Sequence, residues 1–132
     1  MNIGQVAKHT GISAKMIRYY EEIGLIEPAR RSDAGYRIYS GQDLKTLAFI
    51  KHARELGFSS EQMKELISLW RNTDRSSAEV KRLASMHIAT LNAKIKTMQD
   101  MVKALEQSVS CCAGNEHPEC SILDQLEKGM SA

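Results

Sequence analysis

The sequence predicts a mostly α-helical protein: an N-terminal winged helix-turn-helix with a small β-hairpin wing, one long helix that pairs in an antiparallel coiled coil, and a loop before a final short helix. Three observations predict this fold class. Short, capped helical patterns with glycine stops occupy residues 1–70. An apolar heptad pattern extends over residues 84–109. The three cysteines are confined to residues 111–120, after that pattern ends.

Composition narrows the class of protein before any motif is considered. A chain of 132 residues fits one domain, or one small domain with an appendage. We expect a cytoplasmic protein with no membrane partner, because no apolar run approaches the roughly 18 residues of a membrane span and the N-terminus lacks the apolar core of a signal peptide. The net charge is only +2, so binding to nucleic acid would depend on where the cations lie.

Two short helical patterns open the chain. Asn2, with a glutamine three residues later, predicts a capped start for the first helix, which Gly11 ends. Ser13 is a good N-cap for a second helix over about residues 14–23, and Gly24 supplies its stop. Two helices joined by a glycine-containing turn outline a helix-turn-helix, although many other helical proteins contain such a pair.

An arginine-rich segment follows the second helix. Turn-forming residues at 32–35 precede strand-forming residues at 36–39, which predicts a small hairpin. The hairpin would present Arg30, Arg31 and Arg37 beside the second helix. Arginines interleaved with tyrosines suit phosphate contacts and stacking. The alternative interpretation is an ordinary solvated, charged turn.

Two further helices follow the wing. Ser40 with Asp43 predicts a capped start for the third helix, and Gly57 ends it. Ser59 with Gln62 forms another capping box, which begins the fourth helix. The inner positions of this helix are apolar and predict packing into a core: Met63, Leu66, Ile67 and Trp70.

Residues 71–76 predict a linker before a long helix over residues 77–110, with Ser76 and Glu79 suited to cap its start. Apolar positions along it alternate by four and three: Ala84, Ile88, Leu91, Ile95, Met98, Val102, Leu105 and Val109. A helix about 50 Å long is too long to bury this seam on so small a head. The seam therefore predicts a partner helix, most simply in a homodimer, and we favour an antiparallel pair because it separates the two heads.

The cysteine segment is the last feature. Cys111 and Cys112 are adjacent, and a turn-containing loop can bring Cys120 back towards Cys112, before a short helix that Ser121 could cap. Soft thiolates select Cu(I), Zn(II) or iron–sulfur centres. Paired zinc knuckles and a fourth cysteine are missing, and two thiolates suit a monovalent d¹⁰ ion. A redox-active thiol pair and inert cysteines remain alternatives to a metal loop.

Several motifs carry a family resemblance: Ile17-Arg18-Tyr19-Tyr20-Glu21, Gly24-Leu25, Arg31, Gly35-Tyr36-Arg37, Tyr39 and the later segment RELGFSSEQ. Together they resemble the MerR family of transcription regulators, and the resemblance covers essentially the whole chain. It implies a winged helix-turn-helix DNA-binding domain at residues 1–70, a linker at 71–76, a dimerisation helix at 77–110, and a metal-binding loop with a short helix at 111–132.

The resemblance implies a homodimer that binds double-stranded promoter DNA and acts on RNA polymerase by distorting that DNA. The implied DNA contacts are basic or aromatic: Lys15, Arg18, Tyr19, Arg31, Tyr36, Arg37 and Arg54. The first three would lie in the major groove, the next three would hold the flanking backbone, and the last would contact a phosphate. No nucleophile–base constellation or phosphate loop is present, so we do not expect an enzyme.

Within the family the chain most resembles the CueR-type copper-efflux regulators. Cys112 and Cys120 match their pair of cysteines seven residues apart, which implies Cu(I), or Ag(I) or Au(I), as the effector ion. Ser77 stands where sensors of divalent metals and mercury have a cysteine. Lys81 matches a lysine that would offset the negative charge of a bis-thiolate.

Two positions depart from that pattern. Cys111 adds a cysteine that simpler copper sensors lack, and Ser121 stands where a proline often follows the second cysteine. Both positions bear on the preference among Cu(I), Ag(I) and Au(I). Two alternatives to this effector also stay open. One is a sensor of Zn(II) or another divalent ion that uses the three cysteines with His117, and the other is a thiol redox sensor.

Overall fold

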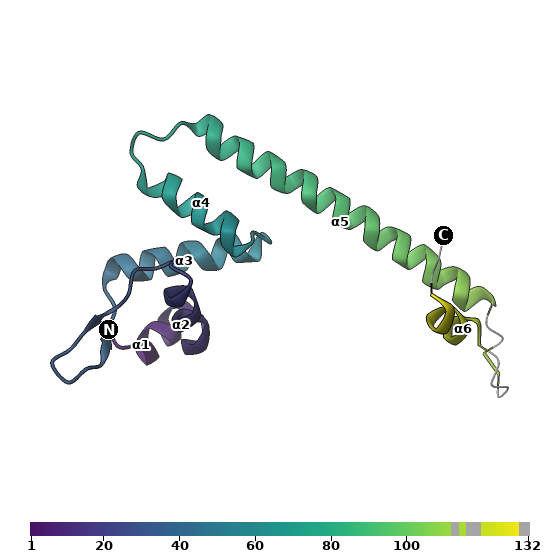
Figure 1. The fold of residues 1–132 in the computed structure, drawn as a ribbon, viewed down its shortest axis with the longest axis horizontal. Helices are drawn as coiled ribbons and strands as arrows, with labels where there is room; N and C mark the ends of the chain where they lie inside the picture. The colour runs from purple at the N-terminus through teal and green to yellow at the C-terminus, as the bar shows by residue number, and fades with distance from the viewer. Residues whose placement is uncertain (112–113, 116–119, 130–132) are drawn as a thin grey trace. The chain divides into compact units, whose positions relative to one another are not determined.

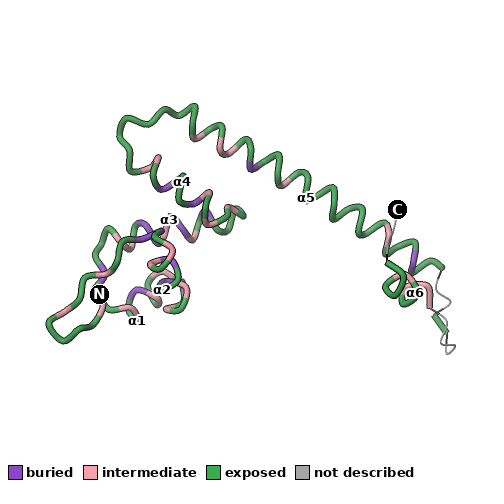
Figure 2. Tube along the Cα trace, in the orientation of Figure 1, coloured by how far each residue is buried: buried purple, intermediate pink, exposed green. Residues whose placement is uncertain are grey.

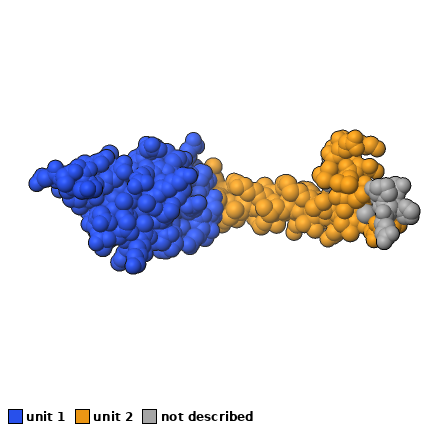
Figure 3. Space-filling view, turned by 90° about the horizontal axis from the view of Figure 1, so that it is seen from below, with its two compact units in different colours: residues 1–83 blue, residues 84–132 orange. Residues whose placement is uncertain are grey.

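The computed structural model describes residues 1–111, 114–115 and 120–129. The described residues form helices and one two-stranded antiparallel hairpin, as predicted (Figure 1): α1 (Ile3–Thr10), α2 (Ala14–Glu22), β1 (Arg30–Arg31), β2 (Arg37–Ile38), α3 (Gly41–Glu55), α4 (Ser60–Arg71), α5 (Ser77–Cys111) and α6 (Ser121–Lys128). The chain divides into two compact units, residues 1–83 and 84–132 (Figure 3). None of the described helices is both long enough and apolar enough to cross a membrane.

The predicted capping signals begin the helices of the first unit. Asn2 and Ser40 each take part in a capping box in which the side chain three residues later bonds the cap's own amide. Ser59 forms a third box, and the Ser13 hydroxyl accepts a hydrogen bond from the amide of Met16 at 3.2 Å. These interactions span only three residues, which is why the sequence pattern alone located them.

The core of the first unit is made by the inner faces of α1 to α4 and the turns between them (Figure 2). Its most deeply buried apolar side chains include Val6, Ile17, Ile26, Leu47 and Ile50. α3 and α4 are held together by a stacked aromatic pair, Phe49 and Trp70, with ring centroids 4.5 Å apart, and by a 2.8 Å hydrogen bond from Arg71 to the buried Thr46 hydroxyl.

The long helix leaves most of its apolar seam exposed. Six of the eight seam side chains are about half or more exposed: Ile88, Ile95, Met98, Val102, Leu105 and Val109. A shallow hollow lies along the middle of this face, lined by side chains from Ile95 to Glu106. The helix also ends one residue later than expected, at Cys111, so Cys111 is a helical residue.

α6 begins differently from the prediction. Ser121 was expected to be its N-cap, but Cys120 occupies that position and makes no side-chain cap bond. The Ser121 hydroxyl instead donates a 2.6 Å hydrogen bond to the carbonyl of Ser108 in α5. The expectation was wrong because α6 begins one residue earlier than predicted, at its N-cap Cys120, and the contact with α5 places the Ser121 hydroxyl within donating distance of a carbonyl that lies 13 residues away in the sequence.

Candidate functional site

The exposed face of α2 carries the side chains expected to enter a DNA groove. Lys15, Arg18 and Tyr19 are exposed, whereas Ile17 and Tyr20 on the opposite face are buried. The ring planes of Tyr19 and Tyr20 are tilted by 53° and their centroids are 6.0 Å apart, so the exposed Tyr19 ring contacts the buried Tyr20 ring. α2 is therefore amphipathic in the sense required of a recognition helix, with its apolar stripe holding it on the head.

The wing presents its tip to solvent. Tyr36 is 73% exposed, and the Arg31 guanidinium donates a 2.9 Å hydrogen bond to the carbonyl of Gly35. The turn is closed by Ser32, whose amide donates to the carbonyl of Tyr36 and whose hydroxyl accepts from the amide of Tyr36. Gly35 has φ of +88°, which a residue with a side chain rarely adopts. Arg31 and Tyr36 thus lie together at one fixed turn.

A single carboxylate ties this wing to α2. Glu21 accepts hydrogen bonds from the amide of Ala29 at 3.1 Å and from the hydroxyl of Tyr39 at 3.2 Å. The Nε of Arg37 lies 3.4 Å from the same carboxylate. Arg37, expected to contact DNA, is therefore also a structural partner of Glu21. The importance of Glu21 was missed because its partners are 8 to 18 residues away.

The surroundings of Tyr39 shift its titration. Burial raises the pKa of Tyr39 to about 12, and the charge of Glu21 and its hydrogen bond add to the rise. Arg37 and Arg18 act in the opposite direction. The phenol is therefore a neutral hydrogen-bond donor at any physiological pH, and the link between α2 and the wing does not titrate there.

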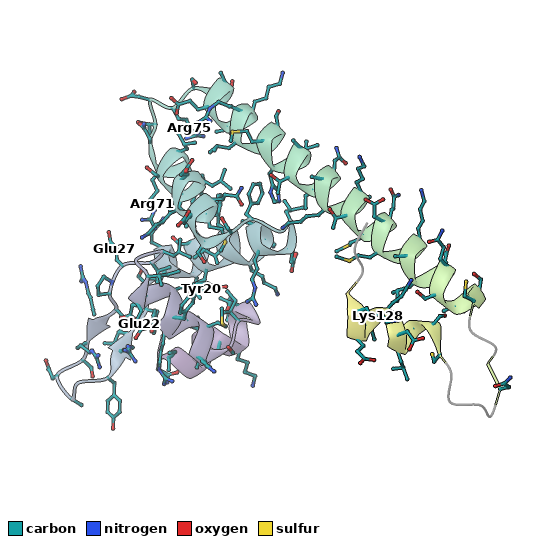
Figure 4. The ribbon with its side chains drawn as sticks, turned by 45° about the vertical axis from the view of Figure 1, so that its right-hand side comes forward. Tyr20, Glu22, Glu27, Arg71, Arg75 and Lys128 are labelled. Atoms are coloured by element: carbon teal, nitrogen blue, oxygen red, sulfur yellow. The ribbon has the colours of Figure 1, made fainter. Side chains whose placement is uncertain are left out.

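Arg54 lines a hollow beside the turn that precedes α2. Its guanidinium donates a 3.3 Å hydrogen bond to the hydroxyl of Tyr20, which lies among the helices of the head (Figure 4). Lys51 lines the same hollow, and a Cβ placed on Gly11 would lie 2.9 Å from its Nζ. Glu55 also lines it. The charged residues that line the hollow thus have a net positive charge, and Lys51 is a cation that the sequence analysis did not single out.

The start of α5 gathers another set of expected residues. Ser77 and Lys81 are exposed and line one hollow with Thr73, Arg75 and Val80. Arg75, labelled in Figure 4, donates 3.2 Å hydrogen bonds to the carbonyls of Trp70 and Asn72 at the end of α4. This places a second cation beside Lys81, again one that sequence reasoning missed.

The cysteines are described only in part. Cys111 is exposed at the end of α5, and Cys120 is half-buried just before α6. Cys112 and His117 lie outside the described residues. Within the segments that the structure does describe, no three histidine, cysteine, aspartate or glutamate side chains gather as a metal site. The pairing of Cys112 with Cys120 therefore stays a prediction.

Two sequence families match the chain. The family described as MerR HTH family regulatory protein matches residues 1–70, and the one described as MerR, DNA binding matches residues 44–107. The matches overlap at α3 and α4 and together extend from the N-terminus into the long helix.

Individual relatives match over nearly the whole chain. Heavy metal-dependent transcription regulator 2 of Rhizobium meliloti is 48% identical over 131 residues, covering 99% of this chain and 89% of that protein. The transcriptional regulator CueR of Escherichia coli is 40% identical over 126 residues, covering 96% and 93%. Among solved structures, the regulator PbrR691 of Ralstonia metallidurans in complex with lead(II) matches with a TM-score of 0.81 at 28% identity, covering 96% of this chain and 98% of that one.

Proposed function

We propose that this chain, which belongs to the MerR family of helix-turn-helix regulatory proteins, is a metal-responsive transcription regulator whose effector is a monovalent coinage metal ion. The observation that carries the DNA-binding part is the exposed face of α2, held beside the wing by Glu21. The metal part is supported by a relative named for its dependence on heavy metals and by a similar structure solved with lead(II).

The DNA contacts would come from two surfaces of one head. Lys15, Arg18 and Tyr19 of α2 would read base edges in a major groove, where an exposed helix face fits. The wing side chains Arg31, Tyr36 and Arg37 would hold the flanking phosphate backbone, and Arg54 would contact a further phosphate. Phosphate contacts fix the register of the protein on the duplex, while the α2 side chains supply sequence preference.

The effector ion would be held by the thiolates of Cys112 and Cys120. Two thiolates with a monovalent ion carry one net negative charge, which must be offset where it is shielded from water. The described part of the segment fits this need, because Cys120 is the N-cap of α6 and so lies at the positive end of that helix. Cu(I), Ag(I) and Au(I) share the chemistry. Cys111 would tune the preference among them.

The partner subunit would complete the site. The exposed seam of α5 suits a homodimer in an antiparallel coiled coil. In such a dimer the start of one α5 helix would approach the cysteine segment of the other. Ser77 would supply no third thiolate there, which would favour a monovalent over a divalent ion. Lys81 would offset the remaining negative charge.

Regulation would work through the shape of the promoter. The dimer would occupy double-stranded promoter DNA with and without the ion, and the ion-bound protein would distort that DNA so that RNA polymerase can use it. Such a switch requires the ion to bind the two protein states with different affinity. No step in this scheme requires catalysis by the chain.

In vitro transcription with purified RNA polymerase under buffered Cu(I), Ag(I), Au(I), Zn(II) and Hg(II) tests the proposal. We expect activation by the monovalent ions and none by Zn(II). Cys112→Ala or Cys120→Ala should abolish activation and leave promoter binding intact. Cys111→Ala and His117→Ala should largely preserve activation by the monovalent ions. A response strongest to Zn(II) would contradict the monovalent assignment, and activation by peroxide without metal would favour a redox sensor.

A further inference from the structure

The contact between α6 and α5 includes two side-chain hydrogen bonds. None of the residues of α6 is fully buried, and Leu123 and Leu126 are 63% and 65% exposed. Ser108 of α5, by contrast, is only 2% exposed. The carbonyl of Ser108 accepts the 2.6 Å hydrogen bond from the hydroxyl of Ser121. The hydroxyl of Ser108 donates a second hydrogen bond to the side-chain oxygen of Gln125.

These bonds fix the register of α6 along α5. Apolar packing is non-directional and tolerates sliding, particularly where it is shallow, whereas a hydrogen bond weakens steeply with distance and angle. Ser121 and Gln125 are four residues apart and therefore lie on one face of α6, and both bond the same residue of α5. Ser108 thus acts as a single anchor point for the whole short helix.

The anchor also fixes both ends of the cysteine segment. Cys111 follows Ser108 by three residues on the same helix, and Cys120 directly precedes Ser121. Cys120 is in turn fixed to α6, because its carbonyl accepts the amide of Asp124 at 3.1 Å. A ligand residue whose backbone is already held in place loses less conformational entropy when it binds an ion.

We propose that Ser108, Ser121 and Gln125 form a latch that positions Cys120 for metal binding and so sets the affinity of the cysteine segment for its ion. The inference rests on the proposed function. Ser121 and Gln125 are positioning residues: they contact no ion, and they act by holding the backbone on which the thiolate of Cys120 is carried. Loss of either bond lets α6 slide or detach, and Cys120 must then be repositioned when the ion binds.

The test is Cu(I) affinity of the reduced, full-length protein, measured by competition with a chromogenic Cu(I) chelator. Ser121→Ala and Gln125→Ala should each weaken binding roughly 3- to 10-fold, the range expected for the loss of one hydrogen bond. Ser121→Thr keeps the hydroxyl and should bind as the wild type does. Ser110→Ala is the matched control, because the hydroxyl of Ser110, in the same turn of α5, donates a hydrogen bond to the carbonyl of Gln107 within that helix.

Amide hydrogen exchange of the metal-free protein gives a second readout. Residues 121–128 should exchange faster in Ser121→Ala and Gln125→Ala than in the wild type, and Ser110→Ala should leave them unchanged. Cu(I) binding by Ser121→Ala that equals the wild type would overturn the latch and leave the proposed function standing. A wild-type protein that binds none of Cu(I), Ag(I) and Au(I) would instead overturn the proposed function, and the latch with it.

Discussion

Glu21 illustrates at the residue scale how one carboxylate joins the two DNA-binding elements. It accepts hydrogen bonds from the amide of Ala29 and the hydroxyl of Tyr39, and it forms an ion pair with the guanidinium of Arg37. Its side chain is only 13% exposed, so its charge is poorly hydrated and depends on these partners. Hydrogen bonds to a charged group are stronger than neutral ones, which makes Glu21 the residue that sets the wing against α2.

Glu21→Gln should lower the pKa of Tyr39 part of the way from about 12 towards its ordinary value of 10.0, because burial, the largest cause of the rise, remains while the negative charge that adds to it is removed. Absorbance titration of the tyrosinate band measures this, with Tyr39→Phe identifying the band. The raised pKa means that the folded protein holds this proton more tightly than the unfolded chain. The stability it contributes is complete below about pH 10 and is lost as the pH rises through 12.

The same substitution should weaken promoter binding, because the wing loses its orientation relative to α2. Glu22→Gln is the matched control: it removes the same charge one residue away, from an exposed side chain that is labelled in Figure 4. Equal promoter affinities of the two variants in a fluorescence-anisotropy titration would show that Glu21 acts only through its charge.

At the scale of single elements, α5 is the helix whose apolar face stays exposed in a single chain. Its seam side chains are large, apolar and exposed along most of its length. Exposed apolar surface of this extent is typical of an interaction site, and the heptad spacing predicts a helix as the partner. The hollow lined by Ile95, Met98 and Val102 lies in the middle of this surface.

Ile95→Glu should weaken dimer formation, because it places a carboxylate from each copy in the seam that the proposed dimer would bury. Burying an unpaired charge costs at least about 2 kcal/mol, so we expect the dimer Kd to rise by more than about tenfold. Sedimentation equilibrium measures it. Thr97→Glu introduces the same residue two positions further along the exposed helix, off the seam, and should remain dimeric. A dimer that withstands Ile95→Glu would place the interface elsewhere.

For the molecule as a whole, DNA affinity should depend steeply on salt, although the net charge is only +2. Cations released from DNA phosphates supply this dependence, and each neutralised phosphate contributes roughly 0.9 to the slope of log K against log salt concentration. The slope therefore counts phosphate contacts per dimer, whatever the total charge of the protein.

Arg54→Ala should reduce the magnitude of that slope by roughly 1.8, because a dimer loses one phosphate contact from each head. Binding titrations over a range of salt concentrations provide the slope. Tyr20→Phe removes the hydroxyl that accepts the hydrogen bond from Arg54. The positive charge of Arg54 remains in this variant, so the slope should be unchanged. An unchanged slope in Arg54→Ala would show that Arg54 contacts no phosphate and acts only through its hydrogen bond to Tyr20.

Much of this protein follows from interactions between residues close in the sequence. Asn2, Ser13, Ser40 and Ser59 begin their helices as predicted because a cap and its acceptor are three residues apart. The heptad seam and the motif around α2 are equally local patterns. The sequence by itself therefore determined the helices, the hairpin and the family, and it predicts a partner along α5.

Tertiary structure decided which of several possible partners each polar side chain takes. Glu21 could have been one more solvated carboxylate on α2, but the fold brings Arg37 and Tyr39 to it from the wing. Ser121 was expected to cap its own helix, but in the folded chain its hydroxyl lies beside α5 and donates a hydrogen bond to the carbonyl of Ser108. Such choices join segments distant along the chain. They are settled by distances of a few ångströms that only the folded arrangement of the helices defines.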